Sequence, residues 1–172
     1  MRKVEVSSYN ERWPAMFEEE VKMLYHIFGK EIISIHHIGS TSVPGLQAKP
    51  IIDIMPVVRD IYLIDSYNEA MREIGYIPKG ENGIHGRRYF QKGGKKRTHH
   101  VHMFQVGSSN IKRHLAFRDY LRAHAEVKKR YGELKTQLAE QYPYDIESYI
   151  EGKNDLVKKI ERKALQWKHE SY

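Results

Sequence analysis

The sequence predicts an α/β or α+β fold, with one small mixed β-sheet flanked by helices and a helical C-terminal third. Short β-branched or aromatic runs alternate with helical patterns in the first two thirds of the chain, which is typical of layered domains. Beyond residue 108 the sequence is charged and follows helical periodicity throughout. The runs expected to be strands are 32–38, 51–58, 87–92 and 98–106.

The first helix is expected to begin at Trp13-Pro14, because proline at the first turn has no N–H to leave unpaired. Gly29 is a plausible end. Asp60 is a suitable N-cap for a second helix that runs to Ile74 and ends at Gly75. The apolar residues at helical spacing in the first helix are Met16, Phe17, Val21, Leu24, Ile27 and Phe28.

The later segments predict a hairpin followed by helices. The strands 87–92 and 98–106 flank Gly93-Gly94-Lys95-Lys96, which indicates a turn with a basic tip. A cap at residues 108–110 begins a helix that runs to about His124. Two more helices are expected, over 126–141 and 155–168, with a break at Tyr142-Pro143.

Length and composition favour one soluble globular domain over residues 1–172. The absence of cysteine excludes disulfides and thiolate chemistry. The first residues contain no apolar stretch typical of a signal peptide, and no apolar run approaches a membrane span, so we expect a cytoplasmic protein. A net charge of +7 favours anionic partners such as nucleotides or phosphates. Nucleic acid is the least favoured partner, because the basic residues are dispersed among acids.

The stretch from His36 to Val58 contains the main chemical signals. The polar turn Gly39-Ser40-Thr41-Ser42 follows one apolar strand and offers backbone N–H groups and hydroxyls that suit phosphate oxygens. Taken alone, these are also ordinary turn residues. Asp53 then lies within the apolar run Ile51-Ile52-Asp53-Ile54-Met55, where an isolated carboxylate would be costly to bury. Asp53 is therefore expected at a polar cleft or beside a partner, where it could hold a divalent cation.

These residues resemble the signature of the nucleotidyltransferase superfamily, a hydrophobic-Gly-[Gly/Ser] turn followed by an Asp-hydrophobic-[Asp/Glu] strand. The resemblance implies that Gly39, Ser40 and Ser42 hold nucleotide phosphates and that Asp53 holds metal. Met55 stands where the second carboxylate of the signature belongs. Because a thioether is a poor ligand for Mg²⁺, the usual two-metal arrangement is in doubt.

Five blocks along nearly the whole chain resemble the GrpB family of bacterial proteins: "HIGSTSVPGLQAKPIIDI", "GRRYFQKGG", "RTHHVHMF", "HLAFRDYLRAH" and "YIEGKNDLV". The resemblance implies the nucleotidyltransferase fold. Some members of that family are fused to dephospho-coenzyme A kinase, which implies a link to coenzyme A biosynthesis.

His100 and His102 are candidates to complete the site. Alternating side chains along a strand place both histidines on one face. If that face meets Asp53, the three residues form a carboxylate and two imidazoles, which suit Mn²⁺, Fe²⁺ or Zn²⁺ better than Mg²⁺. A neutral histidine could also act as a general base. A structural pair of strand histidines is the alternative.

Several cations could hold an anionic substrate, among them Arg87 and Arg88 at the start of the hairpin, and the four selected as site residues are Lys49, Arg88, Arg97 and Arg118. Arg88 and Arg97 flank the hairpin and could form a cross-strand fork for phosphate. Arg118 shares a helix face with His114 and Arg122, and a solvated basic stripe is the structural alternative.

Two functions follow from these residues. The first is metal-dependent transfer of a nucleotidyl or phosphoryl group. The resemblance implies Mg²⁺ or Mn²⁺ as the cofactor, and Asp53, His100 and His102 would be catalytic residues or metal ligands. The second is a catalytically inactive module of the same fold that binds a nucleotide or a coenzyme A precursor. The substrate, the metal and the oligomeric state are not indicated by the sequence.

Overall fold

The computed structural model describes residues 3–170, and the chain forms two compact units. The first, here called the sheet unit, consists of residues 12–38 and 51–111. The second, here called the helical unit, consists of residues 3–11, 39–50 and 112–170 within the described range. The single domain expected from the chain length stays a prediction.

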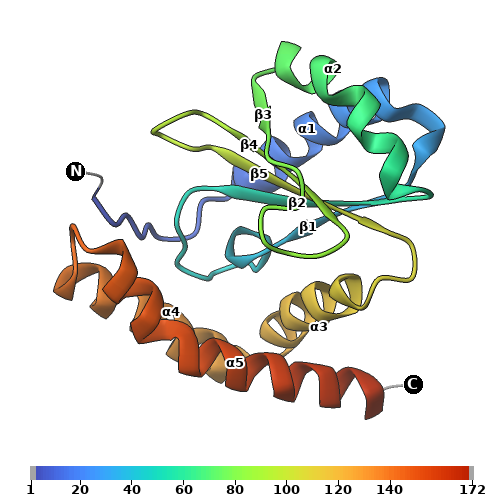
Figure 1. The fold of residues 1–172 in the computed structure, drawn as a ribbon. Helices are drawn as coiled ribbons and strands as arrows, with labels where there is room; N and C mark the ends of the chain where they lie inside the picture. The colour runs from blue at the N-terminus through green and yellow to red at the C-terminus, as the bar shows by residue number, and fades with distance from the viewer. Residues whose placement is uncertain (1–2, 171–172) are drawn as a thin grey trace. The chain divides into compact units, whose positions relative to one another are not determined.

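The sheet unit contains a five-stranded mixed sheet of order β1-β2-β5-β4-β3 (Figure 1). The central strands β2 and β5 are parallel, while the other neighbouring pairs are antiparallel. The predicted mixed sheet and hairpin are therefore confirmed. The strands are β1 (Ile32–Ile38), β2 (Ile52–Val58), β3 (Tyr76–Pro78), β4 (Arg87–Lys92) and β5 (His99–Gln105).

The helices α1 (Trp13–Phe28) and α2 (Asn68–Glu73) lie on the same side of this sheet (Figure 1). On α1, the ring of Phe17 stacks on His37 at 4.8 Å between centroids. Glu20 is buried on the same helix and accepts a hydrogen bond from the Tyr76 hydroxyl at 2.7 Å. Helix α1 therefore covers this face of the sheet. Ile54 is paired with His37 and lies on the same face. Because side chains alternate along a strand, the adjacent Asp53 lies on the opposite face.

The second predicted helix differs from the one observed. Asp60 caps it as expected, since its carboxylate accepts from the Tyr62 N–H at 3.0 Å. The segment Ile61–Tyr67 is a 3₁₀-helix, however, and only Asn68–Glu73 is α-helical. The buried residues Ile61 and Ile64 are three apart, which matches the three-residue turn of a 3₁₀-helix. Strand β3 was not predicted, because three residues carry little pattern.

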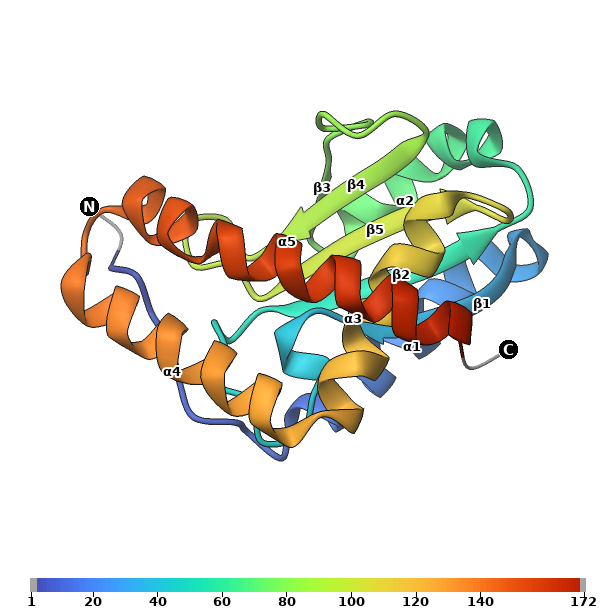
Figure 2. The same ribbon diagram turned by 90° about the horizontal axis from the view of Figure 1, so that it is seen from below.

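The helical unit contains most of α3 (Ser109–Ala123), together with α4 (Ala125–Gln141) and α5 (Ile146–Glu170). A short turn joins α4 to α5 (Figure 2). Of the described helices, none has an apolar stretch of the length needed to cross a bilayer. The main core of this unit consists of Val43, Leu46, Ala116, Tyr120, Leu121, Tyr131, Ile160 and Ala164.

The break at Tyr142-Pro143 is confirmed, but the expected start of the last helix at residue 155 was wrong. The helix α5 begins at Ile146. Asp145 caps it, because its carboxylate oxygens accept from the Ser148 N–H at 3.1 Å and from the Ser148 hydroxyl at 2.6 Å.

Candidate functional site

The sheet unit places Asp53 between two strands. In the register of the sheet, Asp53 is paired with Ile38 on β1 and with His100 on β5. Residues two apart on a strand share a face, so His102 lies on the Asp53 side as well. The predicted meeting of Asp53 with the β5 histidines is therefore present in the fold.

We refer to Asp53, His100 and His102 as the Asp53 cluster. Asp53 Oδ1 lies 2.9 Å from His102 Nε2 and 3.4 Å from His100 Nδ1. The side chains are partly exposed, at 26% for Asp53, 19% for His100 and 13% for His102, so a small ion or ligand can reach them. One ligand atom from each residue lies within 4.8 Å of the others, which makes a set that could hold a metal ion.

Arg87 sets the proton arrangement of this cluster. Its Nη1 lies 3.3 Å from His102 Nδ1, and an arginine can only donate hydrogen bonds. His102 Nδ1 is therefore the acceptor, and the neutral ring carries its proton on Nε2, where it donates to Asp53 Oδ1. A cation that took His102 Nε2 as a ligand would require this proton to move to Nδ1, the nitrogen that Arg87 faces.

The carboxyl group of Asp53 stays ionised in this setting. Burial alone would raise its pKa, but hydrogen bonds from His100 and His102, with a favourable electrostatic interaction of the carboxylate with both imidazoles, lower the pKa below its usual value. Asp53 is thus a permanent anion at the centre of the cluster at neutral pH, as a cation ligand should be.

Tyr89 lines the cluster on the β4 side. Its ring centroid lies 5.6 Å from that of His100 and 5.3 Å from that of His102. Two nitrogens of this unit, His100 Nε2 and Arg97 Nε, are buried without a hydrogen-bond partner. A buried unpaired polar atom is costly, so these two nitrogens mark places where a ligand or water would be stabilised.

Met55 occupies the position of the absent second carboxylate. It lies two residues after Asp53, shares its face of β2, and is fully buried. Among the described residues, the Asp53 cluster is the one group of three acidic or histidine side chains with metal-binding geometry. The donor set is therefore one carboxylate and two imidazoles, not two carboxylates.

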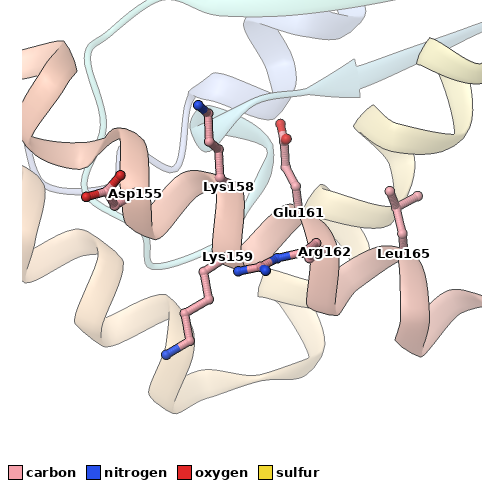
Figure 3. Close-up of a pocket in the computed structure, with 6 residues that line it drawn as sticks. All are labelled: Asp155, Lys158, Lys159, Glu161, Arg162 and Leu165. Carbon is pink, nitrogen blue, oxygen red and sulfur yellow. The ribbon is translucent and has the colours of Figure 1, made fainter.

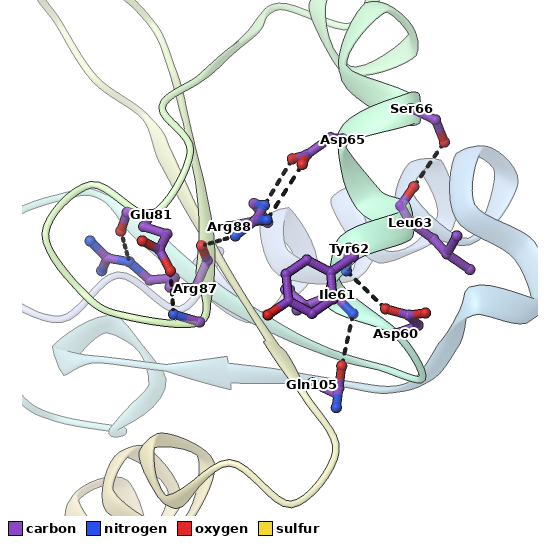
Figure 4. Close-up of polar contacts among 11 residues, drawn as sticks. Asp60, Ile61, Tyr62, Leu63, Asp65, Ser66, Glu81, Arg87, Arg88 and Gln105 are labelled. Atoms are coloured by element: carbon purple, nitrogen blue, oxygen red, sulfur yellow. Dashed lines mark hydrogen bonds and ion pairs between the residues drawn. The ribbon is translucent and has the colours of Figure 1, made fainter.

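The expected fork between Arg88 and Arg97 was wrong. In the register of β4 and β5, Arg88 faces Met103. Arg88 instead forms an ion pair with Asp65, Nε to Oδ1 at 2.8 Å, and points away from Arg87 (Figure 4). Arg87, which the sequence analysis did not select, is the arginine that contacts the cluster; its position one residue earlier puts it on the Asp53 face.

The helical unit holds the predicted phosphate turn, Gly39 followed by the 3₁₀-turn Ser40–Ser42. Gly39 has φ 73°, a backbone conformation that favours glycine. Arg122 donates to the Ser42 carbonyl from Nε at 2.9 Å and from Nη2 at 2.7 Å. Two bonds from one planar side chain fix the turn in place.

Lys135 is the residue that the sequence analysis missed at this turn. Its Nζ donates to Ser40 Oγ at 2.9 Å, and the residue is only 2% exposed. Burial, with the charges of Lys153 and Lys49, lowers the pKa of Lys135 to about 7. No simple motif marks it, because a lysine within a charged helical segment is normally solvated.

Lys49 and Lys153 both lie close to the ring of Tyr149 in the helical unit. Their Nζ atoms are 4.9 Å and 5.4 Å from the ring centroid of Tyr149, which is buried. Both lysines also interact electrostatically with Lys135, and the predicted residue Lys49 is thus one of a group with Lys135 and Lys153, here called the lysine cluster.

Arg118 has a different environment. Its Nε donates to Asp119 Oδ1 at 2.8 Å, and Lys168 binds the other oxygen of the same carboxylate at 2.9 Å. These two cations lower the pKa of Asp119, which burial alone would raise. The predicted role of Arg118 in substrate binding stays a prediction.

An open groove on α5 contains none of the predicted residues (Figure 3). Its lining mixes cations, acids and one leucine, which is typical of a solvated helix surface. The residues are Asp155, Lys158, Lys159, Glu161, Arg162 and Leu165.

Comparison with known proteins gives relatives over almost the whole chain. The chain is 57% identical over 167 residues to the UPF0157 protein YqkA of Bacillus subtilis, and this match covers 97% of the chain and 49% of the relative. It is 35% identical over 158 residues to the glutamate-rich protein GrpB of Alkalihalophilus pseudofirmus, covering 89% of the chain and 91% of the relative. The chain thus spans about half the length of YqkA.

A more distant match is a dephospho-CoA kinase of Mycolicibacterium paratuberculosis, at 26% identity over 180 residues, covering 90% of the chain and 44% of that protein.

Two solved structures support the fold. The crystal structure of the conserved protein GrpB from Enterococcus faecalis superposes with a TM-score of 0.91 at 45% identity, covering 94% of this chain and 98% of that one. The Cid1 poly(U) polymerase, solved with MgGTP, superposes with a TM-score of 0.53 at 13% identity, covering 77% of this chain and 43% of that one. The second likeness shows a similarity of fold alone.

A family model described as "GrpB protein" matches residues 3–163. With the relatives and the Enterococcus structure, this match establishes that the chain belongs to the GrpB family.

Proposed function

We propose that the protein is a metal-dependent transferase of a nucleotidyl or phosphoryl group, with the Asp53 cluster as its cation site. The observation that carries the proposal is the position of Asp53 Oδ1 between two imidazole nitrogens, at 2.9 Å and 3.4 Å, on a nucleotidyltransferase-like sheet. Such cations hold phosphate oxygens in transfer reactions that depend mainly on positioning and charge.

The donor set fits a divalent transition metal. Imidazole nitrogen with one carboxylate suits Mn²⁺, Fe²⁺ or Zn²⁺, whereas Mg²⁺ prefers oxygen ligands. Asp53 would hold the ion with its charge, and His100 and His102 would complete the ligands. When bound, the ion would polarise a phosphoryl oxygen of the substrate.

The residues of the chain would divide the remaining tasks. The Gly39–Ser42 turn would bind phosphate oxygens through N–H groups and hydroxyls. Arg97, with a buried Nε that has no hydrogen-bond partner, would donate to an anionic oxygen. Where only one of His100 and His102 binds the ion, the other would accept the proton of an acceptor hydroxyl.

A second candidate function is a non-catalytic module that binds a nucleotide or coenzyme A precursor. The hydrogen-bonded series from Arg87 to His102 to Asp53 favours it, because the series is complete without a metal. The match to a dephospho-CoA kinase supports a coenzyme A precursor as the ligand. A cytoplasmic location agrees with either function and is part of this proposal.

The test is calorimetric titration of nucleoside triphosphates, dephospho-coenzyme A and coenzyme A, with Mn²⁺ or Mg²⁺ and without metal. The variant is Asp53→Asn, and the matched control is Asp65→Asn, an acid of the same unit that pairs with Arg88. Transferase function predicts metal-dependent binding that Asp53→Asn removes and Asp65→Asn retains. Tight binding that ignores both metal and Asp53→Asn would contradict it and favour the binding module.

A further inference from the structure

The lysine cluster of the helical unit brings the positive charges of Lys49 and Lys153 to the buried Lys135. Lys135 lies on α4, Lys153 lies on α5, and Lys49 lies in the segment before β2. Among the described residues, no carboxylate lies within ion-pair distance of Lys135 Nζ, which donates to the neutral Ser40 hydroxyl. A buried lysine with only a neutral partner is costly in the folded protein.

The surroundings of Lys135 come from four segments. On its own helix, Tyr131 has its ring centroid 4.5 Å from the Nζ atom. Ser40 contributes a hydroxyl, and Lys153 and Lys49 contribute positive charge from α5 and from the loop. An anion is the ligand that would convert these like charges from a mutual repulsion into a binding site.

We propose that Lys49, Lys135 and Lys153, with the Ser40 hydroxyl, bind the diphosphate group of a nucleotide-type ligand, and that Lys135 takes up a proton when the ligand binds. The inference rests on the proposed function only in taking the Ser40 turn as a phosphate-binding element, and it requires no metal. A diphosphate is favoured over a single phosphate because three ammonium groups can neutralise two or more negative charges.

The direction of the pH dependence follows from the state of Lys135. Burial and the two neighbouring lysines lower its pKa to about 7, so at pH 8 the amine of the free protein is mostly neutral. A bound dianion favours the charged form and raises that pKa, so binding at pH 8 draws a proton from solution. Affinity should therefore rise as the pH falls from 9 toward 7.

The experiment is calorimetric titration of ADP at pH 8 with EDTA present, in two buffers that differ in ionisation enthalpy. The terminal phosphate of ADP is fully ionised at this pH, so proton uptake belongs to the protein. We expect uptake of about one proton for each ADP bound by the wild type. Lys135→Met should weaken binding about tenfold or more and abolish the uptake.

Lys128→Met is the matched control. Lys128 is also on α4, and its Nζ donates to the Pro44 carbonyl at 3.0 Å, near the same turn. Its removal should leave ADP affinity and proton uptake unchanged. Circular dichroism of each variant checks that the fold is retained.

Three results would overturn the inference: no ADP binding at millimolar concentration in EDTA, equal binding by Lys135→Met, or wild-type binding without proton uptake. Because EDTA removes divalent metal, these failures are separate from a failure of the Asp53 cation site, which is read from Mn²⁺ binding alone.

Discussion

At the scale of single residues, Asp53 is placed in an apolar strand because two histidines of the neighbouring strand meet it. The sequence allowed this to be predicted, since the two-residue period of β5 puts His100 and His102 on one face. Arg87 could not be selected in the same way, because its role depends on which residue of β4 lies beside His102. The register that decides this, Tyr89 opposite His102, is a tertiary property.

Arg87→Gln should raise the affinity of the Asp53 cluster for Mn²⁺ by about tenfold. Arg87 donates to His102 Nδ1 and keeps the proton on Nε2, the nitrogen that a cation would need. A glutamine oxygen could accept from Nδ1–H and free Nε2 as a ligand. Titration of Mn²⁺ measures the effect, and Arg88→Gln is the control, because Arg88 pairs with Asp65. Unchanged affinity in Arg87→Gln would contradict this proton assignment.

Lys135 should make the stability of the protein depend on pH. The pKa of Lys135 is about 7 in the folded chain and 10.5 as an ordinary lysine, so the unfolded state binds more protons between these values. The free energy of unfolding should therefore gain a contribution that rises from about pH 7 to pH 10 and is flat below pH 7. Denaturant unfolding of wild type and Lys135→Met measures it.

The quantity to compare is the difference in the free energy of unfolding between wild type and Lys135→Met, because all other groups titrate in both proteins. Lys135→Met should be the more stable protein at pH 7, and its advantage should shrink as the pH rises. An advantage that stays constant from pH 7 to pH 10 would show that Lys135 is charged throughout.

At the scale of elements, the strands 32–38 and 51–58 and the hairpin were predicted because their apolar patterns are uninterrupted. The start of α5 was not predicted correctly, and Gly152 is one reason. Glycine is a poor helix former, so its presence argues against a helix at this point of the sequence, although tertiary packing stabilises one. A Cβ atom at Gly152 would lie 2.6 Å from Leu138 Cδ2 on α4. The glycine therefore serves the packing of α4 against α5.

Gly152→Ala should destabilise the protein by about 1 kcal/mol. Overpacking against the buried Leu138 costs about 1–3 kcal/mol, while the better helix propensity of alanine returns about 1 kcal/mol. Denaturant unfolding measures the free energy. Asn154→Ala, at an exposed position of the same helix, should be neutral or slightly stabilising. A stabilised Gly152→Ala would contradict the packing described here.

At the scale of the whole molecule, the two kinds of site fall in different units. The sheet unit contains the Asp53 cluster, and the helical unit contains the Gly39–Ser42 turn with the lysine cluster. The fold class could be predicted, because motif order along the chain resembles one family. The lysine cluster could not, because Lys49, Lys135 and Lys153 are far apart in sequence and become neighbours only when α4 and α5 pack.

The most direct test of the transferase proposal is Mn²⁺ binding to wild type, Asp53→Asn and Asp65→Asn, followed by electron paramagnetic resonance. We predict one site in the wild type and in Asp65→Asn, because the neutral His102 ring can free Nε2 for the ion by holding its proton on Nδ1 instead. Asp53→Asn should lose that site. Wild-type protein that binds no Mn²⁺, or Asp53→Asn that binds it equally well, would contradict the account.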